Sequence, residues 1–142
     1  AGITAGGRGA AAGIARALHA HCGPSSDAHR LAHLGAVDAA LSASAAVLRE
    51  TAGWIDAHPR DDAHAVAMRA RLVAEAAAQQ VLAHAGRALG AGPLCRDEGL
   101  SRAVADLPIY LRQSHAERDL ETLGRCLCQA GAAAPEQRSW MP

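Results

Sequence analysis

The feature that most constrains the fold is a stretch at 28–57 in which a large aliphatic residue returns every seven positions. This row consists of Leu34, Leu41, Leu48 and Ile55. An α-helix completes two turns in about seven residues, so such a row forms one stripe along one side of a helix. The repeat therefore predicts a single helix of about 45 Å with a buried stripe, which His58-Pro59 ends.

Composition supports an all-α chain with a core built from small residues. Half of the 142 residues are apolar, but aromatic residues make up only 2% and Phe is absent. Alanine has the highest helix propensity, and its small side chain lets neighbouring helices approach closely. A chain of this length is typical of one domain, so we predict a single helical domain over 1–142.

Charge and cysteine content exclude some classes of partner. The sequence has 14 Lys plus Arg and 14 Asp plus Glu, so no net field attracts nucleic acid or an anionic membrane. No wholly apolar run reaches the roughly 20 residues of a membrane span, and no secretory pattern is visible. We therefore expect a cytoplasmic protein without a membrane span, in which the four cysteines are free thiols.

Helix signals elsewhere in the sequence predict three more main helices. The first covers about 10–22 and stops at Gly23-Pro24, and the third follows Asp61-Asp62 and stops at the Gly90–Pro93 turn. A short helical turn is expected at 96–103. Asp106 is the expected N-cap of the last helix, with Pro108 in its first turn. Four main helices joined by short connections predict an antiparallel up-and-down four-helix bundle, followed by a polar tail from about residue 131.

Polar side chains gather in one segment, LPIYLRQSHAERDLETLG at 107–124. Arg112, His115 and Asp119 are spaced three and four residues apart, which would place them on one helix face. Asp119 is expected to pair with Arg112 or His115. The segment is the candidate functional edge of the bundle, although an exposed set of ion pairs would have the same composition.

The segments ALGAGPLCRD (88–97) and LPIYLRQSHAERDLETLGR (107–125) resemble the C-terminal helical domain of acyl-CoA dehydrogenase-like flavoproteins. This resemblance implies a longer enzyme in which a helical domain and a β domain precede the bundle, and FAD lies between the β domain and the bundle. The implied reaction removes two hydrogens from an acyl-CoA thioester: a carboxylate base takes the α proton and FAD takes the β hydride. A related monooxygenase branch of the family has a His near the corresponding place.

The resemblance also implies roles for individual residues. Gly90 and Gly92 match the glycine-rich turn near the cofactor, and Arg112 matches a cofactor-side arginine. His115 and Glu121 are competing candidates for the catalytic base. The sequence departs from the family after Glu121, where Thr-Leu replaces the usual Gly-Thr, and it lacks the usual Arg and aromatic pair on the first helix.

These implications extend to partners and leave two alternatives open. The complete enzyme would be a homo-oligomer that uses an acyl-CoA thioester and passes electrons to a partner protein or to oxygen. The present chain lacks the β domain, so we do not expect it to hold FAD tightly or to catalyse the reaction alone.

The first alternative is a stand-alone helical interaction or structural module. The second is a metal-binding bundle that uses His19, His21 and Cys22, or the His29/His33 pair on one helix face.

Overall fold

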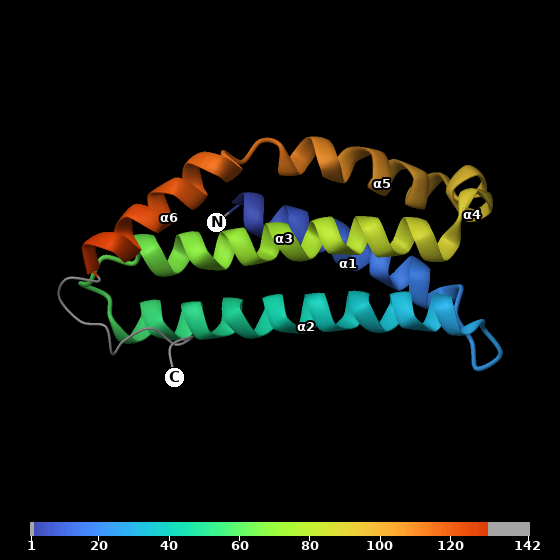
Figure 1. Cartoon of the computed structure of the whole chain (residues 1–142), viewed down its shortest axis with the longest axis horizontal. Coiled ribbons are helices and arrows are strands. Elements are labelled where there is room, and N and C mark those ends of the chain that lie inside the picture. Colours follow the sequence, from blue (N-terminus) through green and yellow to red (C-terminus); the bar gives the residue numbers. More distant parts are fainter. Residues whose placement is uncertain (1, 131–142) are drawn as a thin grey trace.

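The structure, a computed structural model, describes residues 2–130 and is helical throughout this part apart from short connections (Figure 1). The prediction of an all-α chain is confirmed, whereas the predicted tail from about 131 lies outside the described residues. The helices are α1 (Gly2–Ala20), α2 (Ala28–Ala57), α3 (His64–Leu89), α4 (Ala91–Arg96), α5 (Glu98–Leu111) and α6 (Ala116–Ala130).

Helix α3 is the centre of the fold and contacts each of the other five helices. Figure 1 shows it between α2 on one side and α5 and α6 on the other, with α1 crossing behind. Its buried side chains are mostly alanine: Ala70, Ala74, Ala77, Ala78, Val81, Ala85, Ala88 and Leu89. Small side chains let the helix axes approach closely. The large core side chains come from its neighbours, including Ile14 and Leu18 of α1 and Leu107 of α5.

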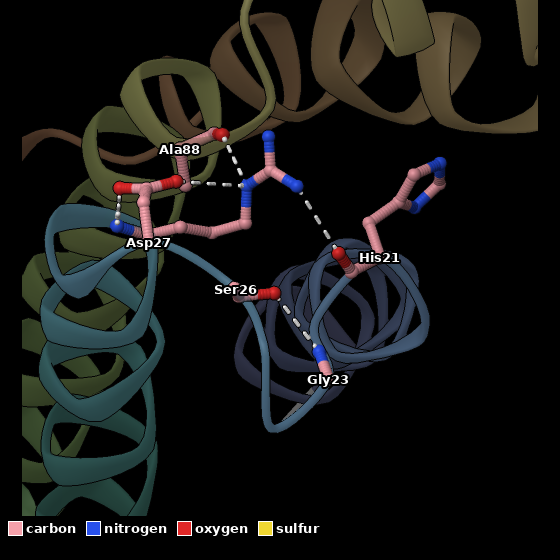
Figure 2. A network of polar contacts seen from close by, with 6 residues as sticks. His21, Gly23, Ser26, Asp27 and Ala88 are labelled. Carbon is pink, nitrogen blue, oxygen red and sulfur yellow. Dashed lines mark hydrogen bonds and ion pairs between the residues drawn. The ribbon is translucent and has the colours of Figure 1, made fainter.

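One arginine joins three helix ends at one end of the molecule (Figure 2). The Arg30 side chain donates from Nε to the Ala88 carbonyl oxygen at the end of α3 (3.2 Å), and from Nη1 to the His21 carbonyl oxygen after α1 (3.3 Å). Asp27 caps α2 by accepting a hydrogen bond from the Arg30 backbone N–H (3.0 Å). This bond is the main reason that the pKa of the Asp27 carboxyl lies below its ordinary value of 3.8. The last carbonyls of two helices, which have no helical donor, are thereby satisfied.

Helix α2 extends over the predicted range but is much less covered than α3. Only Val37 and Ser44 of its 30 residues are buried. The predicted buried stripe is therefore wrong: Leu34, Leu41 and Leu48 are half-buried and Ile55 is exposed. The main contacts of α2 are with α3 and α1. By length and composition α2 is the one helix in the described part that could cross a membrane. A single helix of this kind is weak support for a span, and no clear span is present within residues 2–130.

The C-terminal third differs from the prediction in how it is divided. Asp97, not Asp106, caps the helix here: its carboxylate accepts a hydrogen bond from Leu100 N (2.9 Å) and α5 runs from Glu98. Asp106 therefore lies inside a helix, and Pro108 lies near its end rather than in its first turn. Because proline removes one helical hydrogen bond, it favours a helix end nearby, and α5 stops at Leu111. Six helices result, and the four-helix count is not confirmed.

The N-terminal helix is longer than predicted and packs closely on α5. It begins at Gly2 rather than near residue 10. A β carbon at Gly6 would lie 2.4 Å from Tyr110 Oη, and one at Gly7 would lie 3.4 Å from the Tyr110 ring. The glycines therefore make room for the ring of Tyr110, which explains why a glycine-rich stretch is used where α1 meets α5.

A buried serine on α2 provides a test of the packing between helices. Ser44 is 1% exposed and its hydroxyl has no hydrogen-bond partner among the described residues. Burying an unpaired hydroxyl is unfavourable, so Ser44→Ala should raise the free energy of unfolding by about 1 kcal/mol beyond the gain in helix propensity. The exposed Ser42→Ala on the same helix supplies the propensity gain alone. Equal effects of the two substitutions in denaturant titrations would contradict the buried, unpaired hydroxyl.

Candidate functional site

The break between α5 and α6, at 112–115, divides the polar segment that the sequence singles out. The Ser114 hydroxyl lies 2.7 Å from Glu75 Oε2 on α3 and 2.7 Å from the Leu111 carbonyl oxygen, and both acceptors share its single proton. Glu75 is half-buried on α3. The contact fixes the break against the central helix, so the side chains that flank it have a defined place.

A second contact fixes the start of α6. Asp119 forms an ion pair with Arg71 of α3, and the Asp119 side chain is only 13% exposed. The prediction that Asp119 pairs with Arg112 or His115 is therefore wrong. The reason is the break itself: Arg112 precedes it and Asp119 follows it, so the two residues and His115 do not share one helix face.

Arg112 and His115 point outward at the break. Both are exposed; Arg112 caps α5 through its backbone N–H, which donates to the Pro108 carbonyl oxygen (3.2 Å), and the His115 carbonyl oxygen accepts from Asp119 N (2.9 Å) at the start of α6. Arg112 lines a groove of about 350 Å³ together with Glu75, Gln79, Leu82, Pro108, Leu111, Ser114 and Glu117. A guanidinium can bind an anionic group and an imidazole can take up a proton near neutral pH, so this edge has the groups that an anionic cofactor or substrate would need.

The other candidate base, Glu121, has a partner of its own. It lies on the exposed side of α6 and forms an ion pair with Arg125, one turn further along the same helix. This pair is of the kind that stabilises a helix by tenths of a kcal/mol. The two candidates also differ in position: His115 lies at the break, whereas Glu121 lies more than one helical turn into α6.

The glycine turn lies away from this edge. Gly90 ends α3 with φ of 65°, a left-handed conformation that glycine adopts readily, and Gly92 is exposed within α4. The 14 residues of α5 separate this turn from Arg112, a distance of about 21 Å at the helical rise. The structure thus keeps the predicted cofactor residues in two places, one at each end of α5.

A cleft lies on the other side of α3, between the first half of α1, the end of α2 and the start of α3. It has a volume of about 870 Å³, with an apolar lining that includes Leu48, Ile55 and Met68. Arg8 and Arg71 contribute positive charge, and Asp119 reaches it from α6. A second cleft of about 500 Å³ continues between α1 and α2. The cleft was not predicted, because it depends on how α1 crosses α2.

Arg71 is the partner of Asp119 that the sequence interpretation missed. Its signal was available: Arg71 and Glu75 are four residues apart within 64–89, so they share one helix face. Charged side chains are rarely buried unless they are paired. Their partners, Asp119 and Ser114, could not be identified without the break between α5 and α6.

The histidines named as possible metal ligands do not form a site. His21 Nδ1 donates to the Ala17 carbonyl oxygen (2.8 Å), and His33 Nδ1 lies 2.9 Å from His84 Nδ1. No group of three or more His, Cys, Asp or Glu side chains within the described part of the chain could hold a metal ion. The metal-binding alternative therefore gains no support.

Comparison with known proteins found no family model, no curated protein and no solved structure that matches the chain.

The stability that the Arg71–Asp119 ion pair contributes can be compared with that of the exposed Glu121–Arg125 pair, which lies within α6. Arg71→Met leaves the nearly buried Asp119 carboxylate without its cation, so we expect a loss of about 2 kcal/mol in the free energy of unfolding. Arg125→Met removes the exposed partner of Glu121 and should cost about 0.5 kcal/mol or less. Chemical denaturation measures both. A loss for Arg71→Met no larger than that for Arg125→Met would show that α6 does not depend on this contact.

Proposed function

We propose that the chain is the C-terminal helical domain of an FAD-dependent, acyl-CoA dehydrogenase-like oxidoreductase, in which it closes the flavin and acyl-CoA site. The observation that carries the proposal is the segment 107–125. Its sequence resembles this family, and two contacts with α3, through Ser114 and Asp119, hold it so that Arg112 and His115 remain exposed. Within this segment, Ser114 and Asp119 are thus used in contacts with α3, whereas Arg112 and His115 are available to a ligand.

The uncovered surface of the chain supports a domain within a larger assembly. α2 has only two buried residues, and open clefts lie between it and α1. Apolar faces left open in this way are typical of surfaces that pack against another domain or subunit. In the proposed enzyme the helical and β domains that precede the bundle, and the neighbouring subunits of a homo-oligomer, cover these faces. α1, α2, α3 and the α5–α6 pair then correspond to the four helices of an up-and-down bundle.

The proposal assigns roles at the edge. Arg112 binds an anionic group of FAD or substrate, and the glycine turn at Gly90 and Gly92 lies against another part of the cofactor. The distance between these two places, about 21 Å along α5, suits an extended dinucleotide better than a compact ligand. His115 takes the proton from the acyl thioester because it lies at the break, and Glu121 is the competing base.

Flavin content of the full-length gene product tests the cofactor. The purified protein should show flavin absorbance after addition of FAD, and Arg112→Met should weaken FAD binding. Arg118→Met, a nearby arginine that is exposed on α6, is the matched control and should bind FAD as the unaltered protein does. A full-length protein that stays colourless after FAD addition contradicts the proposal.

Reduction of the bound flavin by acyl-CoA under anaerobic conditions distinguishes the two bases. Loss of a general base usually lowers a rate by about 10²–10⁴-fold, so His115→Asn should slow flavin bleaching to this extent and Glu121→Gln should not. Glu117→Gln is the control: Glu117 is an exposed acid beside the break, so this variant shows whether introducing an amide near the break alters the rate by itself. The opposite ranking assigns the base to Glu121.

The alternative function is a stand-alone helical interaction or structural module without enzymatic activity. The exposed face of α2 favours it, since Leu31 and Ile55 are exposed large apolar residues on this helix. Such a module would bind a partner through α2 and would need neither Arg112 nor FAD. A full-length gene product without a β domain and without flavin, but with a partner bound across α2, would establish this alternative.

A further inference from the structure

The seven-residue repeat of α2 lines an open space between α1 and α2. The repeat places its four large aliphatic side chains on one side of the helix, yet none of them is buried. Leu48 and Ile55 border the cleft of about 870 Å³, and Ile55 is 38% exposed. Leu34 and Leu41 border the second cleft, of about 500 Å³. The stripe is therefore one wall of an unfilled space.

The two clefts form one groove. Ala12 of α1 lines both of them, so they meet where α1 passes this residue. We call the combined space the α1–α2 groove. Along α2 it extends from Leu34 to Ile55, a length of about 32 Å at the helical rise. An element that covers the whole stripe must therefore be long and narrow.

The spacing of the stripe indicates which kind of element fits. Helices that pack along their length repeat their contacts about every 3.5 residues, so each helix presents a large apolar side chain every seven residues. A β-strand repeats every two residues instead. Amphipathic helices also bind in apolar grooves of other proteins through apolar side chains at helical spacing. The stripe of α2 thus matches an α-helix that lies along the groove.

The opposite wall of the groove is cationic. Arg8 and Arg16 of α1 line it, and α1 contains no acidic residue. Both arginines are exposed, and neither forms an ion pair within the part of the chain that the structure describes. The acids that border the groove are Asp119, which is paired with Arg71, and Asp38 on the α2 side. Carboxylates on the flank that faces α1 would therefore complement this wall.

We propose that the α1–α2 groove binds an acidic amphipathic helix of another protein. Large apolar side chains of that helix, seven residues apart, pack against the stripe of α2, and carboxylates on one flank face Arg8 and Arg16. Binding buries the stripe that the chain alone leaves open. The inference goes beyond the proposed oxidoreductase, because it depends on the groove and not on FAD. A failed test of the groove therefore leaves the flavin experiments unaffected.

A labelled peptide tests the proposal with the full 142-residue chain. The probe is a peptide of about 24 residues with Leu at the first and fourth positions of each heptad, Glu at the flanking positions and Ala elsewhere. Its matched control has Lys in place of every Glu. Like charges on the flanks keep either peptide from pairing with itself at neutral pH.

Fluorescence anisotropy at low salt measures binding of the two peptides. The acidic peptide should bind with a Kd of about 10 μM or tighter, and the basic peptide should bind at least about tenfold more weakly, since its charges face Arg8 and Arg16. No binding of the acidic peptide, or equal binding of the two peptides, overturns the proposal.

Two pairs of variants locate the bound peptide. Ile55→Ala should weaken binding about tenfold because it shortens an apolar side chain of the stripe. Ile109→Ala, at a 67% exposed isoleucine of α5 that lines neither cleft, should not weaken it. Arg16→Glu should weaken binding about fivefold, and Arg118→Glu on α6, which changes the net charge equally, should have a clearly smaller effect. Ile55 and Arg16 are exposed, so folding should persist. Equal losses within either pair contradict the assigned groove.

Sedimentation of the chain without peptide distinguishes the other possible occupants. A monomer that binds the acidic peptide supports the proposal. A dimer that Ile55→Ala dissociates, and that the peptide does not, would assign the groove to a second copy of this chain. Peptide binding that appears only after removal of residues 131–142 would assign it to the chain's own C-terminal segment. Either of these two results overturns the proposal.

Discussion

The fold depends on how closely its helices can approach α3. The buried face of α3 is nearly all alanine, so the surrounding helices lie near its axis and the large side chains that fill the core come from α1 and α5. In a chain with so few aromatic residues, this arrangement excludes water through close backbone contact more than through large side chains. The same property makes α3 sensitive to added volume, because larger residues at these positions would separate several helices at once.

Polar groups then determine how the ends and breaks of these helices are placed. Arg30 satisfies carbonyl oxygens at two helix ends, and Glu75 and Arg71 of α3 hold the break between α5 and α6. In both places a charged side chain of a long helix binds a segment that is distant in sequence. The segment with the densest polar composition is therefore partly structural: Ser114 and Asp119 contact α3, and Arg112 and His115 are exposed.

Sequence reasoning predicted the extents of α2 and α3 closely, because the periodic pattern of α2 and the glycine turn at Gly90 after α3 each have a direct physical meaning. It was wrong about the buried stripe of α2, since the seven-residue repeat gives one helix face but does not show that another element covers that face. It was wrong at Asp106 and Pro108, since Asp97 offers an equally good cap nine residues earlier and a proline can end a helix as well as begin one. The outward positions of Arg112 and His115 followed from that break, and the partner of Asp119 could not be inferred without it. The pairing of His33 with His84 also depends on the register of α2 against α3, which the sequence pattern alone does not specify.

The two ends of the layer formed by α1, α2 and α3 are held by different kinds of contact. At one end Arg30 joins all three helices through hydrogen bonds to carbonyl oxygens (Figure 2). Toward the other end a cleft of about 870 Å³ lies between them, and α2 and α3 are joined there by the connection 58–63. Loss of the single Arg30 side chain would therefore release three helix ends at once, whereas at the cleft end the chain connection between α2 and α3 remains.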